Sequence, residues 1–542
     1  MRILFIILIS FLLFSCAQKQ QVDFIITNAE IYTSDDSLPK AQSIAVDKGK
    51  FVCVGTNEEI LSAFNSDNIK DFSGKFIYPG LIDAHCHFIG YAKSLQYADL
   101  KKAASFQDVL EIISEHRKKY PSEWLVGRGW DQNKWSEKVF PDNAELNKIF
   151  PDIPVVLIRI DGHAALANQK ALSITGINSS TKIQGGEIQK KNGNITGILL
   201  DKACDHIRSY IPNPTNTGMA LLLKEAEKQC FAVGLTMLAD AGLDASEIHL
   251  IDSLQKSGAL KMKIYAMLNP TKENYTKYMD KGIYATPLLK IASVKLYADG
   301  ALGSRGALLL APYSDDIKNS GILVESTEAL RETMQRADKA GYQVCTHAIG
   351  DSAVRLILKL YGEILKEKND KRWRIEHSQV VHSNDIHKYG TFSIIPAVNT
   401  THATSDMGWA ENRLGAERIH TAYAYQNLLI QNNWLSNGSD FPIESINPIY
   451  GFHAAIARKD HEGNPENGFL PDNALTREQA LKAMTVWAAR ACFMENEIGS
   501  IKKGMAADFV IFDRDIMKEA EKNVWQFQPL ETFINGQNVM KK

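Results

Sequence analysis

The chain of 542 residues is 45% hydrophobic, enough for a large buried core, and its length alone suggests about three or four domains. Because α/β barrels often exceed the usual domain size as one unit, length does not decide the count. Lys and Arg total 61 against 63 Asp and Glu. With charges so balanced, no strong field exists to attract nucleic acid or to repel acidic ligands, and a nucleic-acid-binding protein is not expected.

The N-terminal segment MRILFIILISFLLFSCAQKQ is typical of an export signal. Arg2 precedes an apolar run at 3–14 that is too short to span a bilayer comfortably. Ser15 before Cys16 resembles a bacterial lipobox, in which Cys16 is lipidated and starts the mature chain; a cleaved signal peptide is the alternative. Either interpretation predicts a signal at 1–15 and an extracytoplasmic protein. The lipobox adds a lipid anchor in the bacterial cell envelope, at the outer membrane or the periplasmic face.

Both chain ends consist of short alternating strands. Residues 22–56 contain the hairpin signal DKGK, and the segments GSIKKGMAADFVIFDRD and PLETFINGQNV repeat the pattern near the C-terminus. Between them, apolar β-rich runs alternate with helical stretches, which indicates a parallel sheet. We therefore predict an α/β fold: a distorted TIM (β/α)8 barrel at 79–490 and a small β-sandwich built from 22–78 and 491–542.

Eight apolar runs are candidate barrel strands. They are residues 79–87, 234–242, 261–268, 291–300, 342–351, 373–380, 392–398 and 433–442. His347 and His377 are separated by the length of one strand, one helix and their turns, and Asp440 follows by about two such units. Polar groups at the C-terminal ends of barrel strands converge on one mouth, where barrel chemistry resides.

The connection after the first strand does not follow this regular spacing of strands and helices. The chain from Phe88 to Val233 is far longer than a usual crossover. It contains the strand-like VVLIRIDGHAAL and the hairpin-like GGEIQKKNGNITGIL. We expect an insertion at about 92–230 that forms a lid or subdomain over the barrel mouth.

His85 and His87 flank Cys86 at the end of the first candidate strand. Residues two apart in a strand share a face, so both imidazoles can point to one place while the cysteine turns away. A metal ion is the usual reason for such a pair, although this motif alone leaves a hydrogen-bonded core pair open. Asp83 lies on the same face and can orient a ligand histidine.

Lys295 lies mid-strand among apolar neighbours, with Asp299 four residues later on the same face. A structural ion pair with a neighbouring carboxylate is one interpretation. In the other, desolvation favours the neutral amine, which can add carbon dioxide to give a carbamate able to bridge two cations. With His347, His377 and Asp440, the set suits zinc or similar divalent ions.

These motifs together identify a resemblance that covers nearly everything after the signal. The chain resembles the amidohydrolase superfamily, in its YtcJ-like, amidohydrolase-3 branch. The segments that carry the resemblance are PGLIDAHCHF, GRGWDQNKW, DGHAALAN, GGEI, GLTMLADAG, VKLYADGALGSRGA, THAIGD, IEHSQ, RLGAERIHTAY, NGSDFPIE and KGMAADFVIFDRD.

The resemblance implies two divalent metal ions, with zinc preferred and manganese or iron as alternatives. The implied metal ligands are His85, His87, a carboxylated Lys295 that bridges the ions, His347, His377 and Asp440. In such sites the metals make a bridging water acidic and polarise the substrate carbonyl. Asp440 would be the catalytic residue that accepts the proton of the attacking hydroxide and passes it to the leaving amine.

Five side chains are candidates for substrate binding: Trp130, Asp131, His163, Arg305 and His402. The alternatives are a packed aromatic turn around Trp130 and Trp135, a core histidine at His163 and a solvated loop charge at Arg305. After the seventh strand, related proteins tend to show a Gln-Pro turn, whereas this chain has Asn399 and Thr400 before His402. This departure puts substrate scope in doubt more than metal binding.

The leading hypothesis is a metal-dependent hydrolase of carbon–nitrogen bonds other than peptide bonds, of the amidase or deformylase type, acting on a small N-acyl or N-substituted amide. A deaminase is weaker, because deaminases of this superfamily generally use one metal without the bridging lysine. A non-catalytic ligand-binding lipoprotein and a structural envelope protein are the other classes. The expected partners are a small amide and, through the lipid anchor alone, a membrane; a homodimer stays open.

Overall fold

The computed structural model describes residues 19–160, 162–183 and 186–540, so the predicted signal and Cys16 lie outside the described residues. Within these residues the chain divides into two compact units. The barrel unit comprises 19–86, 228–245 and 261–540, and the insertion unit comprises 87–227 and 246–260. Of the helices in these described ranges, none is both long and apolar enough to cross a membrane.

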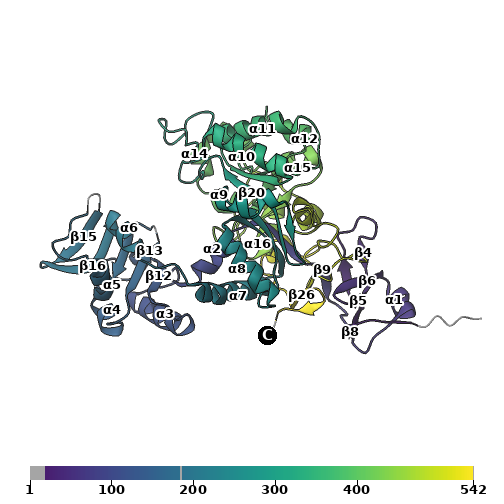
Figure 1. The fold of residues 1–542 in the computed structure, drawn as a ribbon, viewed down its shortest axis with the longest axis horizontal. Coiled ribbons are helices and arrows are strands. Elements are labelled where there is room, and N and C mark those ends of the chain that lie inside the picture. The colour runs from purple at the N-terminus through teal and green to yellow at the C-terminus, as the bar shows by residue number, and fades with distance from the viewer. Residues whose placement is uncertain (1–18, 161, 184–185, 541–542) are drawn as a thin grey trace, which may run out of the picture. The chain divides into compact units, whose positions relative to one another are not determined.

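Eight parallel strands, in the same order as along the chain, form the main sheet of the barrel unit, and the short β19 (Tyr284–Ala285) pairs antiparallel with one of them, β20. Figure 1 shows the ribbon of this unit with β20 labelled. The eight parallel strands are β10 (Leu81–Cys86), β17 (Leu235–Leu243), β18 (Lys263–Leu268), β20 (Leu289–Tyr297), β21 (Gln343–Ala348), β22 (Arg374–His377), β23 (Ile395–Val398) and β24 (Ser436–Asn437). Each falls within, or overlaps, one of the eight predicted runs. The α/β class and the distorted TIM barrel are therefore confirmed.

Helices follow most of these strands, as parallel crossovers require. Those with eight or more residues are α7 (Asn216–Ala232), α8 (Ala245–Lys256), α10 (Thr327–Ala340), α11 (Asp351–Leu365), α14 (Ala410–Arg418), α15 (Tyr425–Asn432) and α16 (Pro448–Ala457). The apolar faces of α10 and α11 bury residues such as Leu330, Met334 and Ile357, which is the pattern of helices packed on a sheet.

The first and last barrel strands meet through a few specific contacts. The Asp440 backbone N–H donates to the His85 carbonyl at 2.8 Å, and the Asp83 carboxylate accepts from the Ser439 backbone N–H at 3.0 Å and from its hydroxyl at 2.6 Å. Gly438 permits this approach, because a Cβ there would lie 2.4 Å from the His85 nitrogen. Asp83 thus joins β10 to the segment after β24.

A sandwich of two sheets completes the barrel unit. One sheet contains β6 (Lys50–Gly55), β5 (Ser43–Asp47), β2 (Phe24–Thr27) and β8 (Ile69–Asp71), and the other contains β27 (Gln537–Asn538), β26 (Glu531–Ile534), β25 (Phe509–Phe512), β9 (Phe76–Pro79), β3 (Glu30–Tyr32) and β4 (Lys40–Ala41). Because β9 pairs antiparallel with β25, strands from both chain ends share one sheet.

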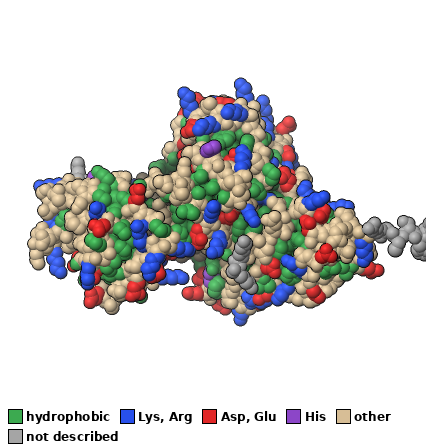
Figure 2. Space-filling model, turned by 60° about the horizontal axis from the view of Figure 1, so that its bottom comes forward, with side chains coloured by type: hydrophobic (Ala, Val, Ile, Leu, Met, Phe, Trp, Pro, Cys, Tyr) green, Lys and Arg blue, Asp and Glu red, His purple; other side chains and the backbone are tan. Residues whose placement is uncertain are grey.

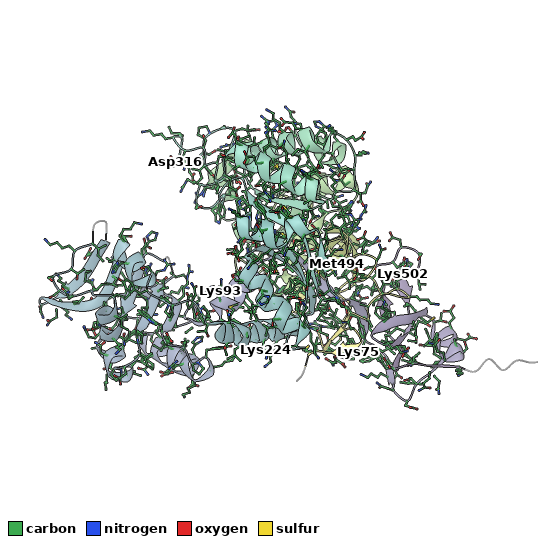
Figure 3. The ribbon with its side chains drawn as sticks, viewed as in Figure 1. Lys75, Lys93, Lys224, Asp316, Met494 and Lys502 are labelled. Atoms are coloured by element: carbon green, nitrogen blue, oxygen red, sulfur yellow. The ribbon has the colours of Figure 1, made fainter. Side chains whose placement is uncertain are left out.

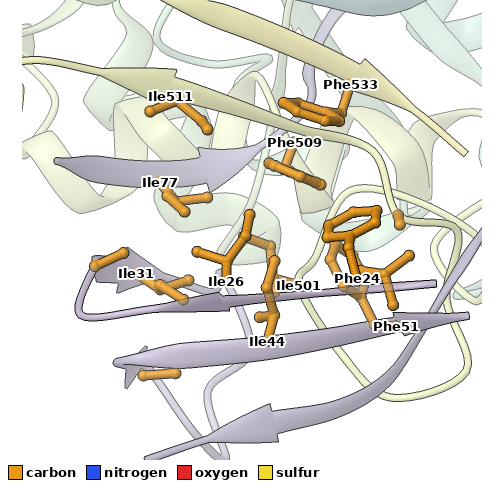
Figure 4. Packing of buried hydrophobic residues seen from close by; sticks show 14 of the residues in the cluster. Phe24, Ile26, Ile31, Ile44, Phe51, Ile77, Ile501, Phe509, Ile511 and Phe533 are labelled. Carbon is orange, nitrogen blue, oxygen red and sulfur yellow. The ribbon is translucent and has the colours of Figure 1, made fainter. Parts of the chain in front are cut away.

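The sandwich core consists of aromatic and β-branched side chains from both ends of the chain (Figure 4). Phe509 stacks on Phe533 with ring centroids 4.3 Å apart, and Phe24 and Ile77 belong to the same buried cluster. The predicted DKGK hairpin joins β5 to β6. Its central residues Lys48 and Gly49 have φ values of 49° and 75°, as a type I′ turn requires.

The insertion unit has its own mixed sheet. Its strands are β11 (Tyr97–Asp99), β12 (Leu125–Trp130), β13 (Val155–Arg159), β14 (Ala164–Ala167), β16 (Asn194–Asp201) and β15 (Gly186–Lys191). The strand-like VVLIR segment and the predicted hairpin β15–β16 are both present. Its helices include α3 (Phe106–Lys119), α4 (Ala144–Ile149), α5 (Gln169–Ile174) and α6 (Lys202–Arg208). The expected placement of this unit over the barrel mouth stays a prediction.

Charged side chains of both signs are interspersed on the face shown in Figure 2. This agrees with the nearly balanced totals of basic and acidic residues. Exposed lysines such as Lys502, and Asp316 in the long loop after β20, are marked in Figure 3.

Candidate metal centre

The predicted metal donors of the barrel unit lie at the C-terminal ends of its strands. His85 is on β10, Lys295 on β20, His347 on β21 and His377 on β22, while Asp440 follows β24. The backbones of His377 and Asp440 have φ values of 72° and 62°, in the left-handed region that non-glycine residues seldom adopt. Such strain is typical of functional sites, where the surrounding structure fixes the conformation.

His85 is at the centre of the first group of donors. Its Nε2 lies 3.2 Å from the Lys295 Nζ and 3.6 Å from an Asp440 carboxylate oxygen. His85, His87 and Asp440 offer ligand atoms that all lie within 4.8 Å of one another. The structure thus brings together the HxH pair, the lysine and the aspartate, as a shared metal site requires.

His347 and His377 form a second group beside the first. Their rings pack edge to face with centroids 4.5 Å apart, and the His377 ring lies 5.0 Å from that of His85. His402, on α13 (Thr400–Asp406), stacks on His377 at 5.9 Å, and its Nε2 is 3.8 Å from Asp440. Among the described residues, the buried Nε2 atoms of His347 and His402 have no hydrogen-bond partner.

Burial holds these groups in the protonation states that metal ligation needs. It lowers the pKa of His85 to about 4, helped by Lys295 and opposed by Glu376, and it lowers the pKa of His347 to about 3. The pKa of His377 is well below its usual value for the same reason. The imidazoles are therefore neutral near pH 7 and each has a lone pair for a cation.

Lys295 is 1% exposed, so its charged form is poorly solvated. Burial lowers its pKa in spite of the opposing charges of Glu376 and Asp440. Asp299, four residues later in the chain, accepts backbone hydrogen bonds from Leu308, Ile349 and Gly350 at 2.8–3.0 Å instead of pairing with Lys295. The Lys295 ammonium lies 4.8 Å from the Tyr297 ring centroid. Lys295 therefore does not pair with Asp299, and the carbamate interpretation stays a prediction.

Two side chains for which the sequence predicted no role at the metal site support the imidazoles. Glu376 accepts a 2.5 Å hydrogen bond from the His85 Nδ1, and Asn399 accepts from the His377 Nδ1 at 2.8 Å. The role expected of Asp83 was wrong in this respect, because its carboxylate binds backbone N–H groups and Ser439 rather than a ring. Each of these hydrogen bonds to Nδ1 leaves the other ring nitrogen, Nε2, available to a metal ion.

Glu376 is in turn held by Arg374, two residues earlier on the same strand face. The guanidinium Nε lies 2.8 Å from the carboxylate, and both side chains are fully buried. Although burial raises the pKa of Glu376, Arg374 and His85 lower it to about 2. In the sequence WRIEH, Arg374 and Glu376 alternate with apolar residues. This alternation was the feature of the sequence that could have indicated the pair.

The candidate substrate residues have other contacts in the structure. Trp130 is buried in the insertion unit, and its indole N–H donates to the Leu157 carbonyl at 2.8 Å, which favours the packed-turn alternative. Asp131 accepts from Arg159 at 2.8 Å. His163 is exposed and lies 3.2 Å from Asp201, so it is not a core histidine.

Arg305 pairs with Asp315 through two hydrogen bonds of 3.0 and 2.9 Å, which favours the interpretation as a loop charge. Of the five candidates, His402 alone is placed beside the metal donors by the contacts within the barrel unit. The substrate roles of Trp130, Asp131, His163 and Arg305 stay predictions.

The donor set fits divalent cations by the chemistry of the residues present. Neutral buried imidazoles, a buried carboxylate and a desolvated lysine provide nitrogen and oxygen donors for zinc or similar ions. The buried Nε2 of His347, which lacks a hydrogen-bond partner within the described chain, is satisfied if it binds a cation. A parallel barrel with such donors at its mouth is the architecture of a metal-dependent hydrolase.

Comparison with known proteins agrees with this architecture. The amidohydrolase family model matches residues 69–540, so the chain belongs to the amidohydrolase family. It is 30% identical to the YtcJ protein of Bacillus subtilis (strain 168), over 94% of this chain and 98% of that protein. It is also 30% identical to the protein LONG AFTER FAR-RED 3 of Arabidopsis thaliana, over 95% and 91% of the two chains.

Two further similarities concern activity and structure. The chain is 27% identical to an N-substituted formamide deformylase of Arthrobacter pascens, over 95% of this chain and 98% of that enzyme. The crystal structure of an uncharacterized metal-dependent hydrolase from Pyrococcus horikoshii OT3 superposes with a TM-score of 0.75 at 28% identity, over 92% and 99% of the two chains. The chain is thus a metal-dependent hydrolase by family and by fold.

Proposed function

We propose that the protein hydrolyses carbon–nitrogen bonds other than peptide bonds, in a small N-acyl or N-substituted amide. The single observation that carries the proposal is the position of the His85 Nε2, which lies 3.2 Å from the Lys295 Nζ and 3.6 Å from an Asp440 carboxylate oxygen. The similarity to an N-substituted formamide deformylase supports an amide as the substrate class.

The residues proposed to hold two divalent ions are His85, His87, Lys295, His347, His377 and Asp440. When bound, such ions supply Lewis acidity, which polarises a carbonyl and makes water acidic enough to attack near neutral pH. Zinc is our first expectation. Lys295, whose pKa burial lowers, is proposed to react as the free amine with carbon dioxide, releasing a proton and giving a carbamate whose oxygens would be metal ligands.

Asp440 is proposed to carry the proton through the reaction. Its carboxylate is 8% exposed and lies between the Nε2 atoms of His85 and His402, at 3.6 and 3.8 Å. There it can take the proton of the attacking water and pass it to the nitrogen of the leaving amine, so that acid and amine leave together. The His402 Nε2, 3.8 Å from Asp440, is proposed to donate to the substrate oxygen as negative charge develops.

We further propose that the protein acts outside the cytoplasm, anchored through a lipidated Cys16. The support is the lipobox-like sequence LFSC after an apolar run. No nucleic-acid partner is proposed, because the net formal charge of −2 supplies no field for one.

The test combines metal analysis with a substrate screen. The purified protein is expected to contain about two divalent ions per chain and to hydrolyse members of a panel of formamides, N-acyl amino acids and cyclic amides. Asp440→Asn is expected to lower kcat by at least about 10²-fold while retaining bound metal, since it removes the proton carrier. Unchanged turnover in this variant would refute the role of Asp440.

Two other classes give different results in the same test. One metal per chain, with activity toward ring amidines instead of amides, would favour a deaminase. A protein without stoichiometric metal that stays inert to added zinc, manganese or iron would be better explained as a ligand-binding lipoprotein.

A further inference from the structure

Asn399 is a buried carboxamide between a metal-site histidine and the segment after β24. It follows β23 directly and is 2% exposed. Its Oδ1 accepts a hydrogen bond from the His377 Nδ1 at 2.8 Å, and its Nδ2 donates to the Gly438 carbonyl at 3.1 Å. One amide therefore contacts a metal-site histidine and the segment that leads to Asp440.

The two bonds need an acceptor and a donor on the same side chain. With its Nδ1–H donating to the Oδ1, His377 keeps a lone pair on Nε2, the nitrogen that remains for a cation. The Gly438 carbonyl can only accept, so it requires an N–H group. Among side chains of this length, only a carboxamide supplies both an acceptor and a donor. If the amide were rotated by 180°, its NH2 would face the His377 N–H and its oxygen would face the Gly438 carbonyl.

The backbone around Asn399 is fixed as well. Its carbonyl accepts from the Tyr425 hydroxyl at 2.9 Å, and the next residue, Thr400, donates its backbone N–H to the Asn437 Oδ1 at 3.0 Å. Since Asn437 ends β24, strands β23 and β24 are joined on both sides of the amide. Movement of the amide would therefore move His377 and the segment of Asp440 together.

We propose that Asn399 is a positioning residue that couples His377 to Asp440, so that the metal-binding and proton-carrying parts of the site hold one relative geometry. The inference deepens the proposed function and rests on it. It predicts that the two hydrogen bonds have separable effects: the Oδ1 contact controls metal affinity, and the Nδ2 contact controls turnover.

Two variants separate these effects. Asn399→Ala removes both bonds and is expected to weaken metal binding by about 10–100-fold, as loss of a residue behind a metal ligand typically does. Asn399→Asp keeps the acceptor for His377 but sets a carboxylate oxygen against the Gly438 carbonyl. We expect its metal affinity to equal or exceed that of the wild type, whereas kcat at saturating metal falls by about 10²-fold.

Metal affinity is measured by competition with a chromophoric chelator, and kcat on the best amide from the substrate screen. The matched control is Asn274→Asp in α9 (Lys272–Lys277). The Asn274 Nδ2 donates to the carbonyls of Leu243 and Asn269 at 2.9 Å, and neither belongs to the metal centre. This control is expected to lower Tm without changing metal affinity or kcat.

The outcomes are distinguishable. Equal loss of metal affinity in Asn399→Ala and Asn399→Asp, or wild-type kcat in Asn399→Asp, would overturn the coupling. Wild-type metal affinity in Asn399→Ala would also overturn it. A wild-type protein that binds no divalent metal would instead refute the proposed function, because the chelator assay needs no substrate.

Discussion

Glu376 holds a metal-site histidine from inside the barrel. It is fully buried between the His85 ring, at 2.5 Å, and the Arg374 guanidinium, at 2.8 Å. The ionised carboxylate fixes the tautomer of His85 and makes its Nε2 more electron-rich than a neutral partner would. The imidazole of His377, by contrast, is supported by the neutral amide of Asn399.

Glu376→Gln tests this role at the scale of one side chain. We expect metal affinity to fall by about 10–100-fold, because the ring of His85 loses its anionic partner. Chelator competition measures the affinity, and Glu325→Gln is the matched control, since Glu325 accepts a backbone N–H of Tyr297 rather than an imidazole. Unchanged affinity would show that the short bond to His85 does not tune the ligand.

This variant also leaves Arg374 buried without its anion, so stability must be measured with it. Loss of one member of a buried ion pair typically costs about 3–5 kcal/mol. Denaturant unfolding of the metal-free protein reports this cost alone. A weaker metal site should appear as an additional difference between variant and wild type when saturating metal is present.

Most of the metal donors could be predicted from the types of residue at strand ends. The side chains that hydrogen-bond these donors could not be predicted. His85, His347, His377 and Asp440 occur where an apolar run ends, and Lys295 lies within one. The resemblance to the amidohydrolase superfamily then implied the whole set as metal ligands. Glu376 and Asn399 matter through partners that are remote in the chain, such as His85 for Glu376. No periodicity encodes such a contact, because it depends on how the strands are arranged around the barrel.

At the scale of elements, the seam between β10 and β24 is the least regular part of the barrel. β24 has two residues, and Asp83 completes the junction by accepting from the Ser439 hydroxyl at 2.6 Å. Ser439→Ala is expected to lower the free energy of unfolding by about 1–3 kcal/mol, because a buried carboxyl loses a hydrogen bond. Urea unfolding of the metal-free protein measures the change.

Ser436→Ala is the matched control for this seam. Ser436 is fully buried on β24, and its hydroxyl has no hydrogen-bond partner within the described chain. Removing that hydroxyl should therefore be neutral or slightly stabilising. If both variants lost the same stability, small changes in packing rather than the bond to Asp83 would explain the effect.

The strands themselves were predictable, while their ends and the turns between them were less so. The seven longer or more apolar strands follow from β-rich runs that alternate with helices. The eighth run, NWLSNGSDFP, contributes only Ser436–Asn437, since the chain turns at Gly438 to approach His85. That turn depends on a neighbour far away in sequence, which a local pattern does not contain.

At the scale of the whole barrel unit, a buried ion pair joins the barrel to the sandwich. Lys263 begins β18, at the end of the barrel opposite to the metal donors, and its ammonium contacts the carboxylate of Asp508, just before β25. Both side chains are at most 3% exposed. The Asn535 backbone N–H donates to the same carboxylate at 2.8 Å.

Lys263→Met is expected to destabilise the barrel unit by about 3–5 kcal/mol, because it leaves Asp508 charged and buried. The double variant Lys263→Met, Asp508→Asn should recover most of this loss, since no uncompensated charge remains. Lys502→Met, which removes a pair between the exposed Lys502 and Asp35, should cost at most about 1 kcal/mol. Denaturant unfolding, followed by two independent spectroscopic signals, would measure these changes in the free energy of unfolding.

Metal content should stay at the wild-type value in all three variants, because the metal donors lie at the other end of the strands. Loss of metal in Lys263→Met, or a double variant no more stable than the single one, would contradict this division between a stability end and a functional end of the barrel.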